Sequence, residues 1–273
     1  MALKLMYITN NKDIAAIAEN SGVDWIFIDL EINGKEERQG HLDTVISRHS
    51  ISDVKKIKQV LTTSKLLVRV NPIFDGSQQE INTVINGGAD IIMLPFFRIR
   101  EEVQYFIDCV NGRAKTCLLL ETPEATDYID SILTIQGIDY IHIGLNDLHL
   151  GYRMKFMFEL LANGMVERLC RKISEKKICY GFGGIAQFGE GTLPAKNIIT
   201  EHYRLGSSMV ILSRSFCRLG VANDLEEIKK IFQSGVQEIR AFESKLALES
   251  EDYFKNNQDI INKTVFEIVN SIQ

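Results

Sequence analysis

The sequence has little of what marks a secreted, membrane or nucleic-acid-binding protein. Its five cysteines are odd in number and form no Cys-x-x-Cys pair, which argues against a disulfide framework and favours a reducing compartment. No run of 18 apolar residues is present, and the apolar stretch at the N-terminus is too short for a signal peptide. Basic residues do not dominate, since 31 Lys and Arg stand against 36 Asp and Glu. We therefore expect a cytoplasmic protein that binds neither membrane nor nucleic acid.

Proline is also scarce, with 4 residues in 273, and no proline-rich linker or internal repeat divides the chain. Hydrophobic residues (45%) and charged residues (25%) occur in the proportions of an ordinary globular protein. A chain of this length buries about 75% of its unfolded surface, so it needs no disulfide or metal to fold. The length suits one α/β barrel and would also permit two small domains.

Short apolar runs alternate with segments of helical periodicity through most of the chain. The expected strands are residues 3–9, 24–31, 65–71, 90–95, 115–121, 139–144, 177–182 and 207–213. They are apolar throughout, which is typical of a parallel sheet covered by helices. Eight such units in one chain favour a closed barrel, and no Gly-x-Gly-x-x-Gly follows the first strand to indicate a Rossmann fold. We therefore predict an α/β fold, a (β/α)8 TIM barrel formed by residues 1–221.

The remaining residues contain no expected strand. LEEIKKIF, VQEIRAFESKLALE and DIINKTVFEIV follow one another with amphipathic helical spacing. We predict that residues 222–273 form C-terminal helices that pack on the barrel or on a neighbouring subunit. The expected assembly is a homo-oligomer.

Charged side chains stand at or near the ends of several expected strands, where TIM barrels keep their catalytic groups. Asp29 and Glu31 end the second strand, Arg69 lies near the end of the third, Glu121 ends the fifth, and Asp147 follows the sixth. A buried charge must be paired or must hold a metal. Carboxylates with one arginine suit a hard divalent cation and an anionic substrate. The alternative is that Arg69 forms a structural ion pair with Glu31 or Glu121.

The same residues carry a family resemblance. GVDWIFIDLE, LLVRVNP, GADIIMLP, LLLETPEA and GIDYIHIGLNDL, in this order, resemble the HpcH/HpaI aldolase and citrate lyase β-subunit family. The similarity covers roughly residues 5–150 and extends more weakly through the last expected strand. It implies a divalent-metal-dependent (β/α)8 barrel that forms or cleaves carbon–carbon bonds of 2-oxo acids. The reaction of such a barrel passes through a metal-bound enolate, often of pyruvate or an acyl-CoA.

The resemblance also implies a role for each motif. Glu121 in LLLET and Asp147 in GLNDL would bind Mg²⁺ or Mn²⁺. Arg69 in VRVN would hold the substrate carboxylate or enolate oxygen, and Glu31 in DLE would orient water on the metal. The substrate carboxylate would also be bound by the backbone amides of Gly144, Leu145 and Asn146. A cation on the 2-oxo oxygen stabilises the developing enolate by several kcal/mol when water is excluded.

The sequence departs from the family where a proton must be moved. One branch places a histidine after the acid of the second strand and steadies it with an aspartate, and here Ile32 and Asn86 stand instead. The other branch places an aspartate after that acid and a lysine after Leu-Pro, and here Ile32 and Phe96 stand instead. Neither Ile32 nor Asn86 accepts a proton at neutral pH. The general base is therefore not identified by resemblance.

The long polar loop after the second strand offers a replacement base. His41, with Asp43 nearby, is our candidate for acid–base catalysis, and His49 is a weaker one. The alternative is a solvated loop whose histidines have no catalytic role. His149 could orient the metal-binding loop, whereas we interpret His142 as a core histidine with satisfied hydrogen bonds.

Two glycine- or serine-containing loops and one aromatic segment complete the candidates. Residues 181–191 and 213–215 follow the last two strands, where many barrels bind phosphate, so they could hold an anion. Glycine-rich turns after strands are also common for conformational reasons alone. FMFELL at 156–161 is expected in the core or at a subunit interface.

Together these observations predict a Mg²⁺- or Mn²⁺-dependent aldolase or lyase acting on a small-molecule 2-oxo acid. One alternative is decarboxylation of an oxaloacetate-like acid at the same metal site, which needs no base to generate the enolate. A second alternative is a barrel that binds a metal or a small acid without catalysis. The aldehyde or acyl partner of the reaction is not indicated by the sequence.

Overall fold

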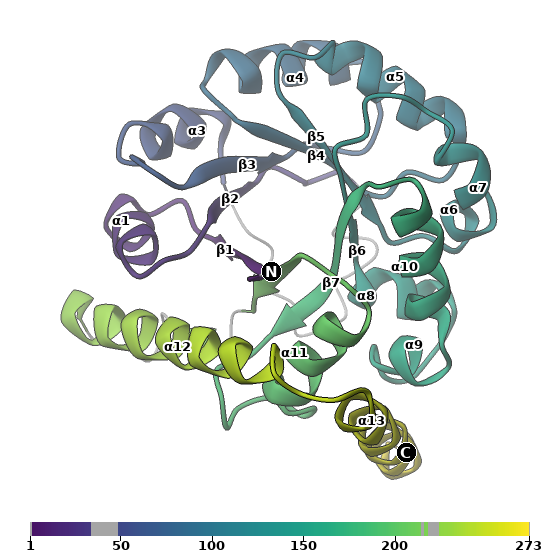
Figure 1. The fold of residues 1–273 in the computed structure, drawn as a ribbon. Coiled ribbons are helices and arrows are strands. Elements are labelled where there is room, and N and C mark those ends of the chain that lie inside the picture. Colours follow the sequence, from purple (N-terminus) through teal and green to yellow (C-terminus); the bar gives the residue numbers. More distant parts are fainter. Residues whose placement is uncertain (1, 34–48, 214–215, 218–223, 273) are drawn as a thin grey trace.

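Eight parallel strands follow one another around a closed barrel in the order of the chain (Figure 1). The computed structural model describes residues 2–33, 49–213, 216–217 and 224–272. The strands are β1 (Lys4–Ile8), β2 (Trp25–Asp29), β3 (Lys65–Arg69), β4 (Ile91–Leu94), β5 (Lys115–Leu120), β6 (Tyr140–Ile143), β7 (Cys179–Ile185) and β8 (Met209–Leu212). Strand β8 pairs with β1 and closes the barrel. The predicted (β/α)8 fold is confirmed.

Helices cover the outside of the barrel. They are α1 (Lys12–Asn20), α3 (Ile51–Lys58), α4 (Ser77–Asn86), α5 (Arg100–Val110), α6 (Pro123–Asp127), α7 (Ile129–Ile132), α8 (Leu145–Gly151), α9 (Glu159–Ala162), α10 (Met165–Glu175) and α11 (Ala195–Arg204). The helical region expected between β6 and β7 is divided into α8, α9 and α10. Arg153 and Gly164 have φ angles of 57° and 75° in these breaks, and a helix cannot pass through that conformation.

The side chains of the strands alternate between two hydrophobic clusters. One face fills the barrel interior with Met6, Trp25, Phe27, Leu67, Ile91, Met93, Cys117, Leu119 and Met209. The other face packs against the helices in a larger cluster. Since successive inward residues are two apart, Asp29 continues the inner face after Phe27, and Glu121 continues it after Leu119. The alternation therefore directs these carboxylates to the mouth at the carboxyl ends of the strands.

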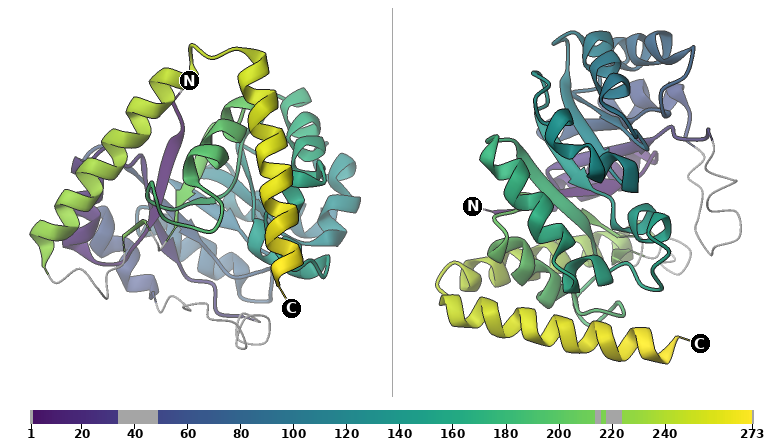
Figure 2. Two further views of the ribbon diagram at one scale, coloured as in Figure 1. Left: turned by 90° about the horizontal axis from the view of Figure 1, so that it is seen from below. Right: turned by 90° about the vertical axis from the view of Figure 1, so that its right-hand side faces the viewer.

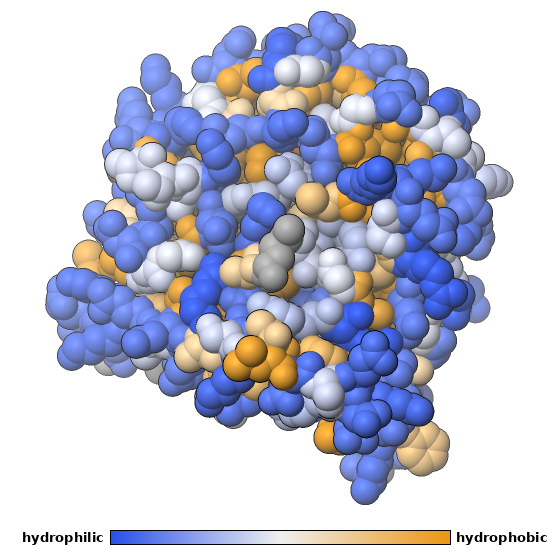
Figure 3. Space-filling model, viewed as in Figure 1, coloured by the Kyte–Doolittle hydropathy of each residue, from blue (hydrophilic) through white to orange (hydrophobic). Residues whose placement is uncertain are grey.

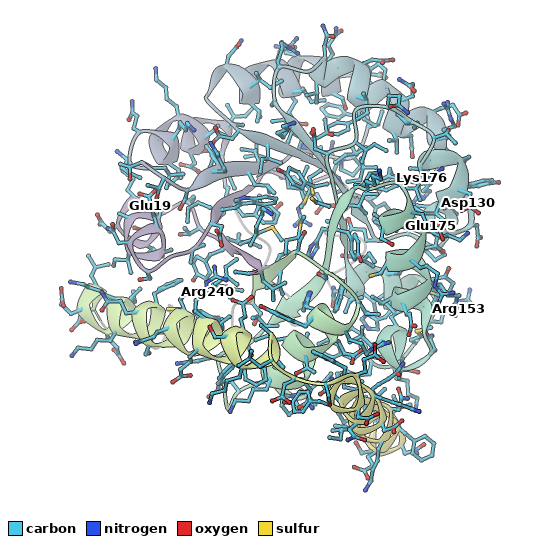
Figure 4. All side chains as sticks on the ribbon, viewed as in Figure 1. Glu19, Asp130, Arg153, Glu175, Lys176 and Arg240 are labelled. Atoms are coloured by element: carbon cyan, nitrogen blue, oxygen red, sulfur yellow. The ribbon has the colours of Figure 1, made fainter. Side chains whose placement is uncertain are left out.

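The C-terminal helix α12 (Leu225–Leu246) is tied to the other end of the barrel, where β1 begins. The Glu243 carboxylate accepts a hydrogen bond of 2.7 Å from the Leu3 N–H and one of 3.2 Å from the Tyr203 hydroxyl. Arg240 points from α12 toward the start of β1 (Figure 4) and donates to the Leu3 carbonyl and to Asp24. The side chain of Glu243 is buried. Helix α12 thus fixes the first residues of the barrel.

The last helix, α13 (Glu251–Ser271), runs along the side of the barrel (Figure 2) and contacts α9 and α11. Its buried Asn257 donates to Glu201 at 3.0 Å and accepts from Asn197 at 2.7 Å, and both partners lie on α11. Neither α12, α13 nor any other described helix has the length and apolar character needed to cross a membrane. Figure 3 shows the face at which β1 begins, where apolar side chains form separate patches among hydrophilic ones.

A buried carboxylate at the start of α3 gives a testable pH dependence. Asp53 accepts hydrogen bonds from the Ser50 N–H (2.8 Å), Lys56 (3.1 Å) and Asn10 (3.2 Å). Burial alone would raise the pKa of Asp53, but these donors outweigh it and lower the pKa from 3.8 to about 2. The ionised group therefore stabilises the fold at neutral pH, and this contribution is lost as the pH falls through the folded pKa.

Asp53→Asn is expected to lower the free energy of unfolding by about 1 to 2 kcal/mol at neutral pH. The difference from the wild type should shrink as the pH falls from about 4 toward about 2. Urea unfolding followed by circular dichroism across this range measures both. Asp130→Asn is the control, because Asp130 points outward (Figure 4) and forms an exposed pair with Lys172. A difference that stays constant with pH would contradict the assignment.

Candidate functional site

The charged residues expected at the strand ends come together at the mouth of the barrel. Arg69 of β3 contacts both Asp29 and Glu31, at the end of β2 and just beyond it. Glu121, directly after β5, lies close enough to Glu31, Arg69 and Asp147 for their charges to shift its pKa. Asp29 and Glu31 each expose 2% of their side chains, and Glu121 is buried as well. The site is thus a dense group of charges that is largely withdrawn from water.

Arg69 is held first by Asp29. Its Nε and Nη2 atoms donate to the two carboxylate oxygens of Asp29 at 2.8 and 2.7 Å, and Nη2 lies 3.3 Å from Glu31. The register of β2 and β3 pairs Asp29 with Arg69, which explains the bidentate geometry. Burial by itself lowers the pKa of Arg69, but Asp29 and then Glu31 raise it well above its ordinary value. The guanidinium is therefore a permanent positive charge at the mouth.

Glu121 is supported by a strained backbone. The Phe96 N–H donates to its Oε1 at 3.1 Å, and Phe96 has a φ angle of 50°. A bulky residue in this left-handed conformation costs about 1–3 kcal/mol, which is a feature of functional sites. Burial, then the charges of Asp147 and Glu31, raise the pKa of Glu121 well above its ordinary value, although Arg69 and the Phe96 N–H oppose the rise. Glu121 and its carboxylate neighbours therefore repel one another in a site where little water screens their charges.

Gly144 lets the backbone of the next loop approach that carboxylate. A Cβ atom at Gly144 would lie 2.9 Å from Oε2 of Glu121, closer than a side chain allows. The Gly144 N–H donates to the Leu120 carbonyl. Gly144 therefore contributes to the site by lacking a side chain, not by offering a free N–H group. The N–H groups of Leu145 and Asn146 begin α8 and have no acceptor within the helix. Of the three amides predicted to bind the substrate carboxylate, that of Gly144 is therefore already engaged, and those of Leu145 and Asn146 are left without an acceptor in the helix.

The carboxylates fit a divalent cation of the predicted kind. Glu121 and Asp147 carry oxygen atoms of the kind that a hard cation prefers, and a cation would relieve their mutual repulsion. Among the described residues, no group of three or more His, Cys, Asp or Glu side chains is arranged to hold a metal. Two carboxylates with the other positions left to water and substrate match the coordination of Mg²⁺, whereas a closed structural zinc site needs four protein ligands.

The candidate histidines differ in where they lie. His41 and Asp43 lie outside the described residues. Nδ1 of His49 accepts a hydrogen bond of 3.0 Å from the Asp29 N–H, so in the neutral ring Nε2 carries the proton. His149 donates to the Leu145 carbonyl at 3.2 Å and steadies α8, the helix that carries Asp147. In this neutral form Nε2 of His49 can donate a hydrogen bond but cannot accept a proton, and Nδ1 is already engaged by the Asp29 N–H.

Two supporting residues were not anticipated from the sequence. The side-chain oxygen of Asn71 accepts hydrogen bonds from the N–H groups of Ile32 and Asn33 at 2.9 and 3.0 Å. Asn71 in turn donates from its side chain to Glu80 of α4 at 2.6 Å. This chain of contacts fixes the backbone just after Glu31. Asn71 could have been found from the sequence, because it is a polar residue two positions beyond Arg69 and therefore lies on the same face of the strand.

The weaker sequence candidates have simpler structural roles. In residues 181–191, Gly183, Gly189 and Gly191 have positive φ angles, which accounts for the glycines by conformation. Residues 214 and 215 lie outside the described residues. Phe158 of FMFELL is buried in the outer cluster and packs edge-on against Phe156, as expected for a core segment. A surface hollow lined by Arg113, Thr116 and Asp139 lies at the opposite end of the strands from the mouth.

Known proteins resemble this chain in sequence and in fold. The family model described as HpcH/HpaI aldolase/citrate lyase matches residues 4–157. No curated protein sequence gives a significant match. An HpcH/HpaI aldolase from Desulfitobacterium hafniense DCB-2 has a TM-score of 0.58 at 15% identity, covering 88% of this chain and 93% of its own.

Two further solved structures have a similar fold. An HpcH/HpaI aldolase/citrate lyase family protein from Burkholderia cenocepacia J2315 has a TM-score of 0.62 at 13% identity, covering 84% of this chain and 95% of its own. The citrate synthase SbnG has a TM-score of 0.61 at 16% identity, covering 84% of this chain and 94% of its own. At such identities the likeness is one of fold, and the family is given by the sequence match, which spans more than half of the chain. The chain belongs to the HpcH/HpaI aldolase/citrate lyase family.

Proposed function

We propose that the protein is a Mg²⁺- or Mn²⁺-dependent carbon–carbon lyase of the aldolase type that acts on a 2-oxo acid. The observation that carries the proposal is the buried Glu121 carboxylate, held against Gly144 and close to the charges of Asp147 and Arg69. Membership of a family of aldolases and lyases supports a lyase-type activity. The arrangement combines a place for a cation with a place for an anion, which is what a 2-oxo acid requires.

Glu121 and Asp147 would hold the cation. A divalent cation there supplies Lewis acidity toward the 2-oxo group, which is worth several kcal/mol in charge stabilisation. Glu31, just beyond β2 and in contact with Arg69, would orient water on the open side of the site. Burial of these groups strengthens every charge interaction, because little water screens them.

Arg69 would bind the substrate through the part of its guanidinium that Asp29 does not use. Asp29 takes Nε and Nη2, so Nη1 is the nitrogen that would donate to a substrate oxygen. The Leu145 and Asn146 amides at the start of α8 would hold the substrate carboxylate. Because Asp29 locks the guanidinium in one orientation, little side-chain entropy is lost on binding.

Decarboxylation of an oxaloacetate-like acid is a second candidate, and the hydrogen bond of His49 favours it. Loss of CO₂ breaks the bond to the departing carboxylate and leaves its electron pair on the 2-oxo acid, so no base is needed to form the enolate. His49 is engaged at Nδ1 and is not arranged as a base. Ile32 and Asn86 stand at the positions of the family's proton-transfer pair, and their inability to accept a proton also favours decarboxylation.

Two assays on the purified protein test these proposals. With Mg²⁺ or Mn²⁺ present, we expect oxaloacetate to lose CO₂ or pyruvate to exchange its methyl protons for deuterium, as followed by NMR. Chelation of the metal should remove either activity, because the enolate loses its charge stabilisation. Decarboxylation without exchange would favour the second candidate, since it isolates the step that needs no base.

A protein that binds the metal but leaves every 2-oxo acid unchanged would contradict both enzymatic proposals. It would support the remaining alternative, a barrel that binds a metal or a small acid without catalysis. Assembly as a homo-oligomer and a cytoplasmic location stay predictions, and light scattering of the purified protein tests the first.

A further inference from the structure

His142 lies inside the barrel, on the strand that leads to Asp147. Tyr140, two residues earlier, packs against the inner cluster, whereas the residues on either side of His142 belong to the outer cluster. The His142 ring therefore faces the barrel interior. In the register of β5 and β6 it lies beside Leu119, the inward residue that precedes Glu121. The ring forms part of the floor beneath the proposed metal site.

The hydrogen bonding of the ring makes its second nitrogen an acceptor. Nε2 lies 3.0 Å from the Gly183 carbonyl oxygen, which can only accept, so Nε2 carries a proton. Burial lowers the pKa of His142 to about 4, with the Gly183 carbonyl opposing this and the Arg69 charge adding to it. The ring is thus neutral at physiological pH, and Nδ1 keeps its lone pair.

That lone pair has no partner among the residues that the structure describes. The ring is buried, with 1% of its surface exposed. A buried acceptor without a donor is unfavourable, and such atoms in native proteins require an explanation. The sequence prediction of a core histidine with both nitrogens satisfied is therefore wrong for Nδ1.

Strand β7 passes close to the ring and has an irregular register there, between Gly181 and Gly184. Both glycines are packed against β8: Met209 fills the space at Gly181, and a Cβ atom on Gly184 would lie 3.2 Å from the Ile211 carbonyl oxygen. The mouth lies directly above the layer of the ring, because Leu119 beside it precedes Glu121 by two residues.

We propose that Nδ1 of His142 accepts a hydrogen bond from a hydroxyl group of the molecule bound at the mouth. This assignment rests on the proposed function, because it places a 2-oxo acid above the ring. It adds a preference: an acid with a hydroxyl near its 2-oxo group binds more tightly than the same acid without one. His142 is in this sense a specificity-determining residue.

Pyruvate and 3-hydroxypyruvate provide a matched pair of probes, since they differ by one hydroxyl. The full-length protein, with ¹⁵N-labelled histidine and Mg²⁺, is titrated with each, and the ring nitrogens are followed by NMR. The five histidines make assignment practical, and loss of one signal in His142→Gln identifies His142. We expect hydroxypyruvate to shift the Nδ1 signal of His142 and pyruvate to leave it in place.

His202 is an internal control with the same chemistry in another location. Its Nε2 is buried without a partner among the described residues, and its Nδ1 lies 2.7 Å from the Ser207 hydroxyl. It stacks on Phe182 at 3.8 Å in the layer between β7 and α11, so neither probe should shift it. A shift of both histidines would indicate a general change in the barrel and would overturn the proposal.

Calorimetry of binding provides a second test of the contact between His142 and the hydroxyl group. His142→Phe should weaken hydroxypyruvate binding about tenfold and leave pyruvate binding unchanged, as expected for one lost hydrogen bond. His142→Gln, which keeps an acceptor and a donor, should restore most of the difference. Equal losses for both acids would overturn the proposal even if the variants fold less well.

The remaining outcomes separate this inference from the proposed function. If both acids bind and the His142 signal does not move, the hydroxyl contact is wrong and the proposed function stands. If hydroxypyruvate shifts the signal but no 2-oxo acid is turned over, the contact stands and the enzymatic role is wrong. If neither acid binds, both are overturned.

Discussion

Glu121→Gln is expected to abolish metal-dependent turnover while leaving the fold intact. The substitution removes one of the two carboxylates proposed to hold the cation, so Mn²⁺ should bind about a hundredfold more weakly or worse. The metal-free variant should nevertheless be at least as stable as the wild type. Burial and the neighbouring charges of Asp147 and Glu31 raise the pKa of Glu121, so the ionised carboxylate is unfavourable where it stands. An amide of the same shape relieves that repulsion.

Electron paramagnetic resonance of free Mn²⁺ measures the binding, and thermal unfolding with a chelator present measures the stability. Glu124→Gln is the matched control, because Glu124 lies three residues further on and forms only a loose, exposed pair with Arg98 at 3.8 Å. It should change neither quantity. Loss of stability in Glu121→Gln together with normal Mn²⁺ binding would contradict the assignment of Glu121 as a metal ligand.

Arg69→Met is expected to have the largest effect on stability of any change at the mouth. It leaves Asp29 and Glu31 buried without the guanidinium that balances their charge. Breaking one side of a buried ion pair costs about 3–5 kcal/mol. Turnover should fall as well, because the proposed contact with the substrate oxygen is lost. Urea unfolding and the decarboxylation assay measure the two effects.

Two further variants show whether a loss of stability in Arg69→Met arises from the buried charges. Arg98→Met removes an exposed arginine from the same rim and should change stability little. The double variant Asp29→Asn, Arg69→Met should regain part of the lost stability, because one of the uncompensated charges is gone. It should not regain turnover. If the double variant is no more stable than Arg69→Met, the cost does not arise from the charge on Asp29.

The barrel was predictable because its signals are local. Each strand is a short apolar run, and each helix shows its period within about a dozen residues. The strand ends were less certain, as in β7, which the sequence ended at residue 182 and which continues to Ile185. Glycine is depleted in strands, so the part of β7 that passes through Gly183 and Gly184 gives no strand signal.

The sequence predicted which residues form the candidate site, but it predicted less well which of them contact one another. Strand alternation directs Glu31, Arg69 and Glu121 to one mouth, and the motifs supply the rest. The bidentate pairing of Arg69 with Asp29 depends on the register of β2 and β3, which periodicity alone does not fix.

Three features of the site depend on how residues far apart in the chain are placed. They are the close approach of Gly144 to Glu121, the contact of the Phe96 N–H with Glu121, and the lack of a partner for Nδ1 of His142 among the described residues. Local periodicity contains no information on any of them. Such features are visible only once the chain is folded.

The hydrogen bond between Leu3 and Glu243 spans 240 residues, and it has a consequence for the newly made chain. At a synthesis rate of 5–20 residues per second, the partner of Leu3 follows it by about 10 to 50 seconds. Strand β8, the second neighbour of β1, also emerges late. During this interval β1 keeps one unpaired edge, which is a template for pairing with another nascent chain. Slow synthesis of residues 209–243 is therefore expected to favour pairing between nascent chains before the barrel closes.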